Sequence, residues 1–93
     1  MTDNPENPLD VRRKRLIYQS QYRGVKENDI ILGRFAQAHM RALDAQGLDD
    51  YEKLLQQPDN DIYDWIAGRE PVPAEFDTPV MRLLLQFKVA QGA

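Results

Sequence analysis

The sequence contains no cysteine and a single histidine, and both shortages limit the chemistry that it can support. Without cysteine, the chain forms neither disulfides nor thiolate–metal bonds, which fits a reducing compartment. His39 lies on the apolar side of a predicted helix, where a packed, hydrogen-bonded histidine is the favoured interpretation. A general base or metal ligand would need partners that we do not find near it. We therefore expect a protein that is not an enzyme and has no metal or cofactor of its own.

Long apolar runs are also missing. The longest, residues 30–32 and 83–85, are far shorter than the roughly 20 residues of a membrane-spanning helix, so we expect no membrane insertion. The first ten residues are polar and include Asp3, Glu6 and Asp10. Acidic residues at this position argue against a secretory signal and against a mitochondrial transit peptide. The simplest prediction is a bacterial cytoplasmic protein.

The length and net charge of the chain limit the number of domains and the kinds of partner. The 93 residues, 42% of them hydrophobic, suffice for one small core, and we expect a monomer. Residues 1–8 are polar, contain two prolines and are predicted to be disordered, which leaves residues 9–93 as a single helical domain. The net charge of −3 disfavours general phosphate binding, so no nucleic acid partner is expected.

No stretch alternates between apolar and polar residues at the period of a strand, so the fold class is all-α, a compact bundle of five short helices. The predicted helices cover residues 11–22, 30–46, 49–57, 59–67 and 79–89. Trp65 stands at helical spacing from Ile62 and Ile66 and should be at least partly buried. One further turn is expected at residues 74–76.

Capping residues set the helix ends in this prediction. The proposed N-caps are Asp10, then Asn28 or Asp29, then Asp49 in a capping box with Glu52, then Asp59 or Asn60, and Thr78 before Pro79. The proposed helix ends are Gly24 with a positive φ, Gly47, Pro58 and Gly68.

The tract from Arg23 to Asp29 joins the first two predicted helices. It brings a basic residue, a permissive glycine and the acidic Glu27 together at one corner. From local physics alone, this corner is a helix junction with a solvated ion pair between Arg23 and Glu27, worth at most about 1 kcal/mol.

The wider pattern adds a second interpretation. Residues 15–20 lead into Arg23-Gly24-x-x-Glu27, and residues 60–65 later form the element Asn-Asp-Ile-Tyr-Asp-Trp, followed by two prolines at 71 and 73. In this order and spacing, from about residue 12 to 88, the chain resembles the succinate dehydrogenase assembly factor 2 family, called SdhE in bacteria. Members of that family help to attach FAD covalently to the flavoprotein subunit of succinate dehydrogenase.

The resemblance implies the same helical architecture and a client-binding role. The partner would be the succinate dehydrogenase flavoprotein, with the fumarate reductase flavoprotein as a further candidate, and the FAD would belong to that client. By match to the motif, Arg23, Gly24 and Glu27 would contact the client near the flavin, with Tyr22 and Asp29 beside them. Many members carry a basic residue where this chain has Tyr22, which would give an apolar or hydrogen-bonding contact instead. On this view, Arg23→Ala and Glu27→Ala should leave the melting temperature almost unchanged.

The basic run Arg12-Arg13-Lys14-Arg15 leaves other classes of function open. It is interpreted as a solvated helix face, as a docking patch for an acidic protein surface, or as the contact of a nucleic-acid-associated module. A small helical adaptor that binds a different protein is the remaining alternative.

Overall fold

The computed structural model describes residues 8–21 and 23–92. The elements are α1 (Pro8–Gln21), α2 (Lys26–His39), the 3₁₀ turn η1 (Met40–Ala42), α3 (Ala45–Leu55), α4 (Asp59–Ala67), the 3₁₀ turn η2 (Ala74–Phe76) and α5 (Pro79–Gly92). The described residues contain five α-helices and no strand, which confirms the predicted all-α class.

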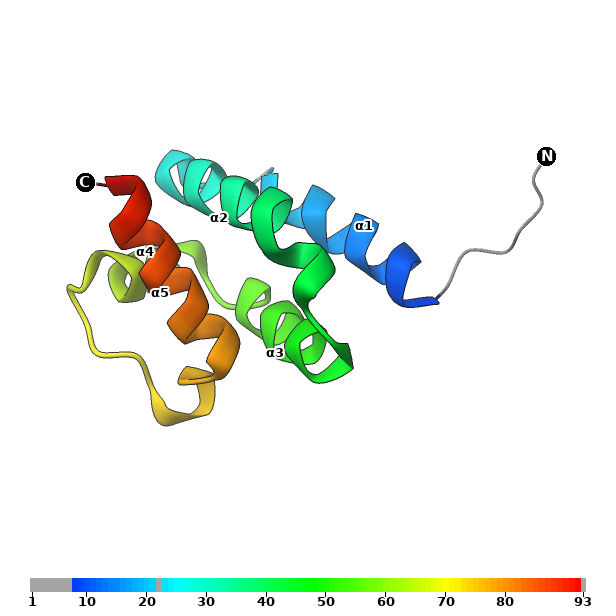
Figure 1. Ribbon diagram of the computed structural model, residues 1–93. Helices are drawn as coiled ribbons and strands as arrows, with labels where there is room; N and C mark the ends of the chain where they lie inside the picture. Colours follow the sequence, from blue (N-terminus) through cyan, green and yellow to red (C-terminus); the bar gives the residue numbers. More distant parts are fainter. Residues whose placement is uncertain (1–7, 22, 93) are drawn as a thin grey trace.

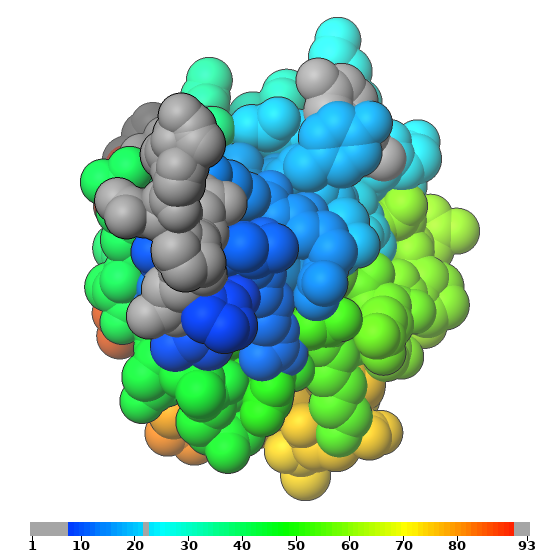
Figure 2. All heavy atoms as spheres, turned by 90° about the vertical axis from the view of Figure 1, so that its right-hand side faces the viewer, coloured from blue at the N-terminus to red at the C-terminus, as the bar shows by residue number. Residues whose placement is uncertain are grey.

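Helices α1 and α2 lie side by side as an antiparallel hairpin, and α3, α4 and α5 pack beneath it (Figure 1). Helix α2 is central, since it contacts α1, α4 and α5. Turned by a quarter, the molecule shows α1 running along one face, with α3 below it (Figure 2). An extended loop links α4 to α5 through η2.

One hydrophobic core lies between the five helices. Every helix contributes at least one residue with no exposed surface, namely Leu16, Leu32, Phe35, Leu48, Tyr51, Ile62 and Leu84. His39 packs against the rings of Phe35 and Phe87, with centroid separations of 5.1 and 5.5 Å. The predicted packing of His39 is therefore confirmed, whereas the predicted hydrogen bond of its ring is not found among the described residues.

The second half of the chain follows its local signals closely. Gly68 ends α4 with φ of 77°, a conformation that glycine adopts without strain. The hydroxyl of Thr78 accepts a hydrogen bond from the Met81 N–H at 3.1 Å at the start of α5. The turn predicted at residues 74–76 is η2.

The first half departs from the predicted helix ends. Helix α1 begins at Pro8, so Asp10 lies in its first turn, and α2 begins at Lys26, four residues before the predicted start. Gly47 does not end a helix; it lies buried in α3, because Asp44 caps that helix by accepting the Gly47 N–H at 2.8 Å. The predicted capping box at Asp49 is therefore wrong.

Tyr51 anchors α3 to α1 through a buried hydrogen bond. Its hydroxyl lies 2.6 Å from Ser20 Oγ, which donates its own proton to the Leu16 carbonyl at 2.7 Å, so Tyr51 is the donor of the pair. Burial raises the pKa of Tyr51 to about 12, although the positive charge of Arg23 acts in the opposite direction.

This raised pKa predicts a loss of stability in alkali. The folded chain keeps the Tyr51 proton between about pH 10 and about 12, whereas the unfolded chain releases it near pH 10. The contribution of Tyr51 to the free energy of unfolding is therefore fully present below about pH 10 and is lost as the pH rises toward 12, by about 3 kcal/mol. Urea unfolding over this range should show a shallower decline for Tyr51→Phe than for the wild type. Identical pH dependence in the two proteins would refute the assignment.

Candidate functional site

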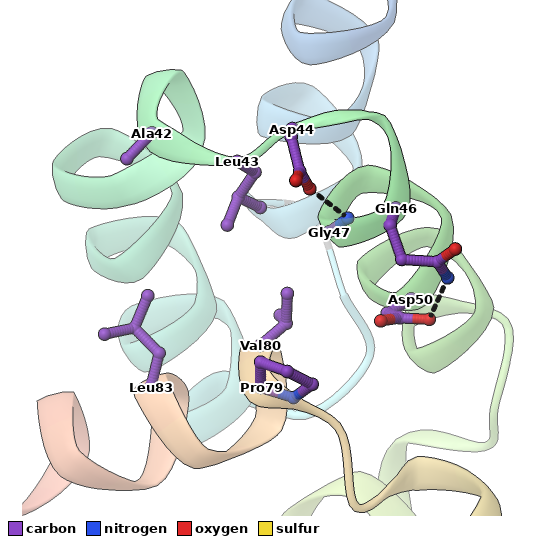
Figure 3. A pocket seen from close by; sticks show the side chains of 9 residues that line it. All are labelled: Ala42, Leu43, Asp44, Gln46, Gly47, Asp50, Pro79, Val80 and Leu83. Atoms are coloured by element: carbon purple, nitrogen blue, oxygen red, sulfur yellow. Dashed lines mark hydrogen bonds between the residues drawn. The ribbon is translucent and has the colours of Figure 1, made fainter.

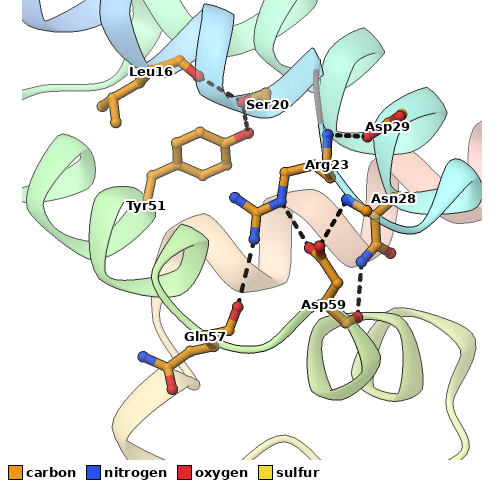
Figure 4. Close-up of polar contacts among 9 residues, drawn as sticks. Leu16, Ser20, Arg23, Asn28, Asp29, Tyr51, Gln57 and Asp59 are labelled. Atoms are coloured by element: carbon orange, nitrogen blue, oxygen red, sulfur yellow. Dashed lines mark hydrogen bonds and ion pairs between the residues drawn. The ribbon is translucent and has the colours of Figure 1, made fainter.

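Arg23 follows the end of α1, and its side chain extends to the connection between α3 and α4 (Figure 4). Its Nε donates to Asp59 Oδ1 at 2.8 Å, and Nη2 lies 3.5 Å from the Gln57 carbonyl. The Arg23 side chain is only 12% exposed, and that of Asp59 is 23% exposed. The guanidinium therefore joins two corners of the fold, so the premise that Arg23 is an exposed charge is wrong.

Gly24 is held by the same carboxylate. Its N–H donates to Asp59 Oδ2 at 2.9 Å, so the two oxygens of Asp59 bind adjacent residues of the corner. A Cβ at Gly24 would lie 3.3 Å from Oδ2, tighter than most such contacts. Glycine therefore favours this close approach of Asp59, since a Cβ would require the carboxylate to shift slightly. The predicted positive φ is wrong, since Gly68 alone adopts one among the described residues.

Two residues at the start of α2 complete this network. Asn28 is fully buried, and its Nδ2 donates to the Asp59 carbonyl at 2.8 Å. Asp29 accepts a hydrogen bond from the Arg23 N–H. Neither residue is the N-cap of α2, which is Val25. Asp29 instead holds the loop of residues 23–25 against the start of α2, and Asn28 ties that start to α4.

The electrostatics of Asp59 follow from these contacts. Partial burial disfavours the charged carboxylate, but the Gly24 hydrogen bond and the Arg23 guanidinium outweigh that effect and lower the pKa of Asp59. The carboxylate therefore remains ionised and paired with Arg23 at neutral pH.

Glu27 differs from its neighbours. It is exposed in the first turn of α2, and within the described residues it forms no ion pair, so the solvated pair with Arg23 is not observed. The corner thus combines an internally fixed Arg23 and Gly24 with an outward Glu27. Tyr22, also predicted at this contact, lies outside the described residues.

The arginines of the basic run on α1 form contacts within the fold. Arg12 pairs with Asp49 at 2.7 Å and with Glu52 at 2.9 Å, and Arg15 approaches Glu52 at 3.4 Å. Arg13 donates to the Leu43 carbonyl at 2.7 Å. These contacts fasten α1 to α3 and to the loop before it. The interpretation of the run as a solvated face is therefore wrong for Arg12 and Arg13, whose side chains are largely covered, whereas Arg15 remains half exposed.

Asp59 and Asn28 are the site residues that the sequence did not reveal as such. Asp59 was predicted only as the start of a helix, and Asn28 only as a cap. Their partners lie 31 to 36 positions away along the chain, beyond the reach of any local pattern. A covarying pair in related sequences is the signal that would have found them.

A separate hollow of about 300 Å³ lies between the start of α3 and the start of α5 (Figure 3). Its polar side chains already have hydrogen-bond partners, since Asp44 caps α3 and Gln46 donates to Asp50 at 3.0 Å. The rest of the lining is largely apolar, including Leu43, Val80 and Leu83. This arrangement is typical of imperfect helix packing rather than of a catalytic centre.

The described residues also lack two other kinds of feature. They contain no group of three or more histidine, cysteine, aspartate or glutamate side chains placed to hold a metal ion. None of the described helices has both the length and the apolar character needed to cross a membrane.

The described residues thus form a small helical domain with a fixed polar corner between α1, α2 and α4. Residues 14–88 match the family described as flavinator of succinate dehydrogenase, and the chain belongs to that family. This finding confirms the family resemblance seen in the sequence.

Curated relatives carry a corresponding name. Succinate dehydrogenase assembly factor 2, mitochondrial, of Dictyostelium discoideum is 45% identical over 82 residues, which make up 88% of this chain and 58% of the relative. Assembly factor 2-A, mitochondrial, of Drosophila yakuba is 43% identical over 91 residues, 95% of this chain and 56% of the relative. Assembly factor 2-B, mitochondrial, of Drosophila simulans is 40% identical over 82 residues, covering 86% and 53%. The chain therefore spans about half the length of these relatives, which are named as assembly factors rather than as enzymes.

These names contradict the predicted bacterial cytoplasmic location, because the relatives are mitochondrial proteins. The prediction depended on three acidic residues among the first ten. Since the match covers only about half of each relative, the first residues of this chain are no guide to targeting.

Proposed function

We propose that the protein is an assembly factor that binds the flavoprotein subunit of succinate dehydrogenase and promotes covalent attachment of FAD to it. The observation that carries this proposal is the match of residues 14–88 to a family described as flavinator of that enzyme. The fumarate reductase flavoprotein is a second candidate client, and the protein acts as a monomer in this proposal.

In this proposal the contact with the client is made by the 23–29 corner. Asp59 holds Arg23 and Gly24 in place, which prepares the surface before the client arrives and reduces the entropic cost of binding. Gly24 is exposed and lets the client backbone approach closely. Glu27 is free to pair with a basic group of the client, and Tyr22 and Asp29 are further proposed client contacts.

The protein carries out no bond chemistry itself in this account. The client supplies the FAD site and the histidine that becomes linked to the flavin. A helper changes the state of its client only if it binds one conformation more tightly than another. We infer that the corner selects the flavoprotein conformation in which the linkage forms, before the iron–sulfur subunit binds.

Glu27→Ala tests the contact with the client without disturbing the fold. Since the side chain is exposed and unpaired within the described residues, its loss should change the free energy of unfolding by less than about 0.5 kcal/mol. Covalent flavin on the flavoprotein should nevertheless fall severalfold. In-gel flavin fluorescence of the flavoprotein subunit, in cells with equal amounts of each variant, measures this.

Lys26→Ala is the matched control, because Lys26 is the exposed, charged neighbour of Glu27 in the same helical turn. It should support normal flavin attachment. Full attachment with Glu27→Ala would show that the corner is only a helix junction. Full attachment in cells that lack the whole protein would refute the assembly function.

A further inference from the structure

A groove of about 330 Å³ lies between α2 and α4 and begins at the corner, because Glu27 forms one end of its lining. Ile30, Ile31 and Ile66 provide its apolar lining, and Arg34 and Lys88 its basic groups. We call this the α2–α4 groove. It shares Glu27 with the proposed client contact, so a bound client would continue directly into it.

Ile30 is unusual for its exposure. It is 44% exposed, and four large hydrophobic side chains are exposed among the described residues. Of these four, only Ile30 borders the groove, since Val11, Tyr18 and Val89 lie outside its lining. An apolar side chain placed against it would remove apolar surface from water on both partners, the main source of favourable free energy in association.

The charges along α2 are ordered with respect to this apolar surface. Glu27, Ile30 with Ile31, and Arg34 follow at spacings that place them on one face of the helix. The acidic and basic ends are separated by seven residues, or about 10 Å along the helix axis. A complementary partner therefore offers a basic group, an apolar side chain and an acidic group in that order over about the same distance.

The basic end of the groove has no counter-ion in the described part of the chain. Arg12, Arg13, Arg15, Arg23 and Arg82 all pair with carboxylates there. Arg34 and Lys88 form no such pair within residues 8–21 and 23–92. In a chain with a net charge of −3, two such cations beside an apolar surface favour an acidic group on a partner.

Asn28 supplies a further observation at the same place. It lines the groove, is fully buried, and its Oδ1 accepts no hydrogen bond within the described residues. A buried acceptor without a donor is costly in a folded protein. An N–H group of a docked segment would satisfy it after a small displacement of the lining.

We propose that the α2–α4 groove receives a segment of the client flavoprotein in which an apolar side chain lies between a basic group, facing Glu27, and a carboxylate, facing Arg34 and Lys88. This inference rests on the proposed function, since it names the surface by which that client is held. The fixed corner contacts the client at one point, and the groove extends the contact along α2.

Affinity measurements with the purified flavoprotein subunit test the groove. Ile30→Glu should weaken binding by about tenfold or more, because it places a charge in the apolar contact. Val11→Glu is the matched control: Val11 is similarly exposed, at 48%, but lies at the opposite end of the α1–α2 hairpin. It should change affinity less than about twofold. Arg34→Glu should weaken binding as well, whereas Arg41→Glu, another exposed arginine, should not.

The outcomes distinguish a failure of the groove inference from a failure of the proposed function. If the wild type does not bind the flavoprotein, the proposed function fails. If the wild type binds and Ile30→Glu and Arg34→Glu bind equally well, the groove inference alone fails. Thermal unfolding of each variant checks the fold, and Ile30→Ser replaces Ile30→Glu if the latter is unfolded.

A photo-crosslinking residue at position 30 identifies the occupant. The expected product joins position 30 to a flavoprotein peptide with an acidic residue within about one helical turn of the crosslinked apolar residue. A crosslink to a second copy of this chain, or to a flavoprotein peptide without acidic residues, would overturn the proposal.

Discussion

Replacing Asp59 by alanine is expected to lower the free energy of unfolding by about 2–3 kcal/mol. The change removes the carboxylate that accepts from Arg23 Nε and from the Gly24 N–H, and it leaves a largely buried guanidinium without its charge partner. Removing one partner of a fully buried ion pair costs more, about 3–5 kcal/mol. The 23% exposure of the Asp59 side chain lets water compensate for part of that loss.

Urea unfolding of Asp59→Ala, Arg23→Ala and the double variant measures the pair directly. The double variant should be destabilised by less than the sum of the single changes, because the two residues act as one unit. Asp61→Ala is the control, since Asp61 is an exposed carboxylate in the first turn of the same helix and should cost less than about 0.5 kcal/mol. Additive effects of the two single changes would show that the contact contributes nothing.

Acid should also lower the free energy of unfolding through Asp59. Because the pKa of Asp59 is lowered in the folded state, its contribution to stability is present above its unfolded value of about 3.9 and is lost as the pH falls below about 4. Asp59→Asn should therefore remove part of the acid sensitivity of the wild type.

Truncation of Trp65 to alanine is expected to be the more damaging change, at about 3–4 kcal/mol. Trp65 is 9% exposed and stacks on Phe76 of η2, with ring centroids 5.1 Å apart. This contact holds the long loop before α5 against α4, so its loss removes buried area and leaves a cavity.

Denaturant unfolding and intrinsic fluorescence test Trp65 together. As the only tryptophan, it should emit at short wavelength in the folded chain and shift to longer wavelength on unfolding. Val89→Ala is the control, because Val89 is 70% exposed near the end of α5 and its truncation should cost little. A Trp65→Ala variant as stable as the wild type would contradict the packing described for α4 and η2.

Local signals predicted the second half of the chain well. Gly68 and Thr78 mark the ends of α4 and α5 because each acts on its own backbone within a few residues. The five helices and the burial of Trp65 follow from the same kind of short-range periodicity.

The corner was harder to predict because its geometry depends on contacts distant in sequence. Asp59 binds residues 35 and 36 positions before it, and the tight approach of its carboxylate, rather than a positive φ, favours glycine at position 24. Similarly, Arg12 takes the carboxylates of Asp49 and Glu52 that local reasoning assigned to a capping box. Charged residues were interpreted as solvated because sequence alone does not show which carboxylate faces them.

We propose above all that this protein promotes flavin attachment to a client flavoprotein without chemistry of its own. The most direct measurement incubates purified flavoprotein subunit, lacking covalent flavin, with FAD and follows protein-linked flavin fluorescence over time. Addition of the wild-type protein should increase the rate of attachment, addition of Glu27→Ala should increase it much less, and Lys26→Ala should match the wild type. An attachment rate unaffected by the wild-type protein would contradict the account.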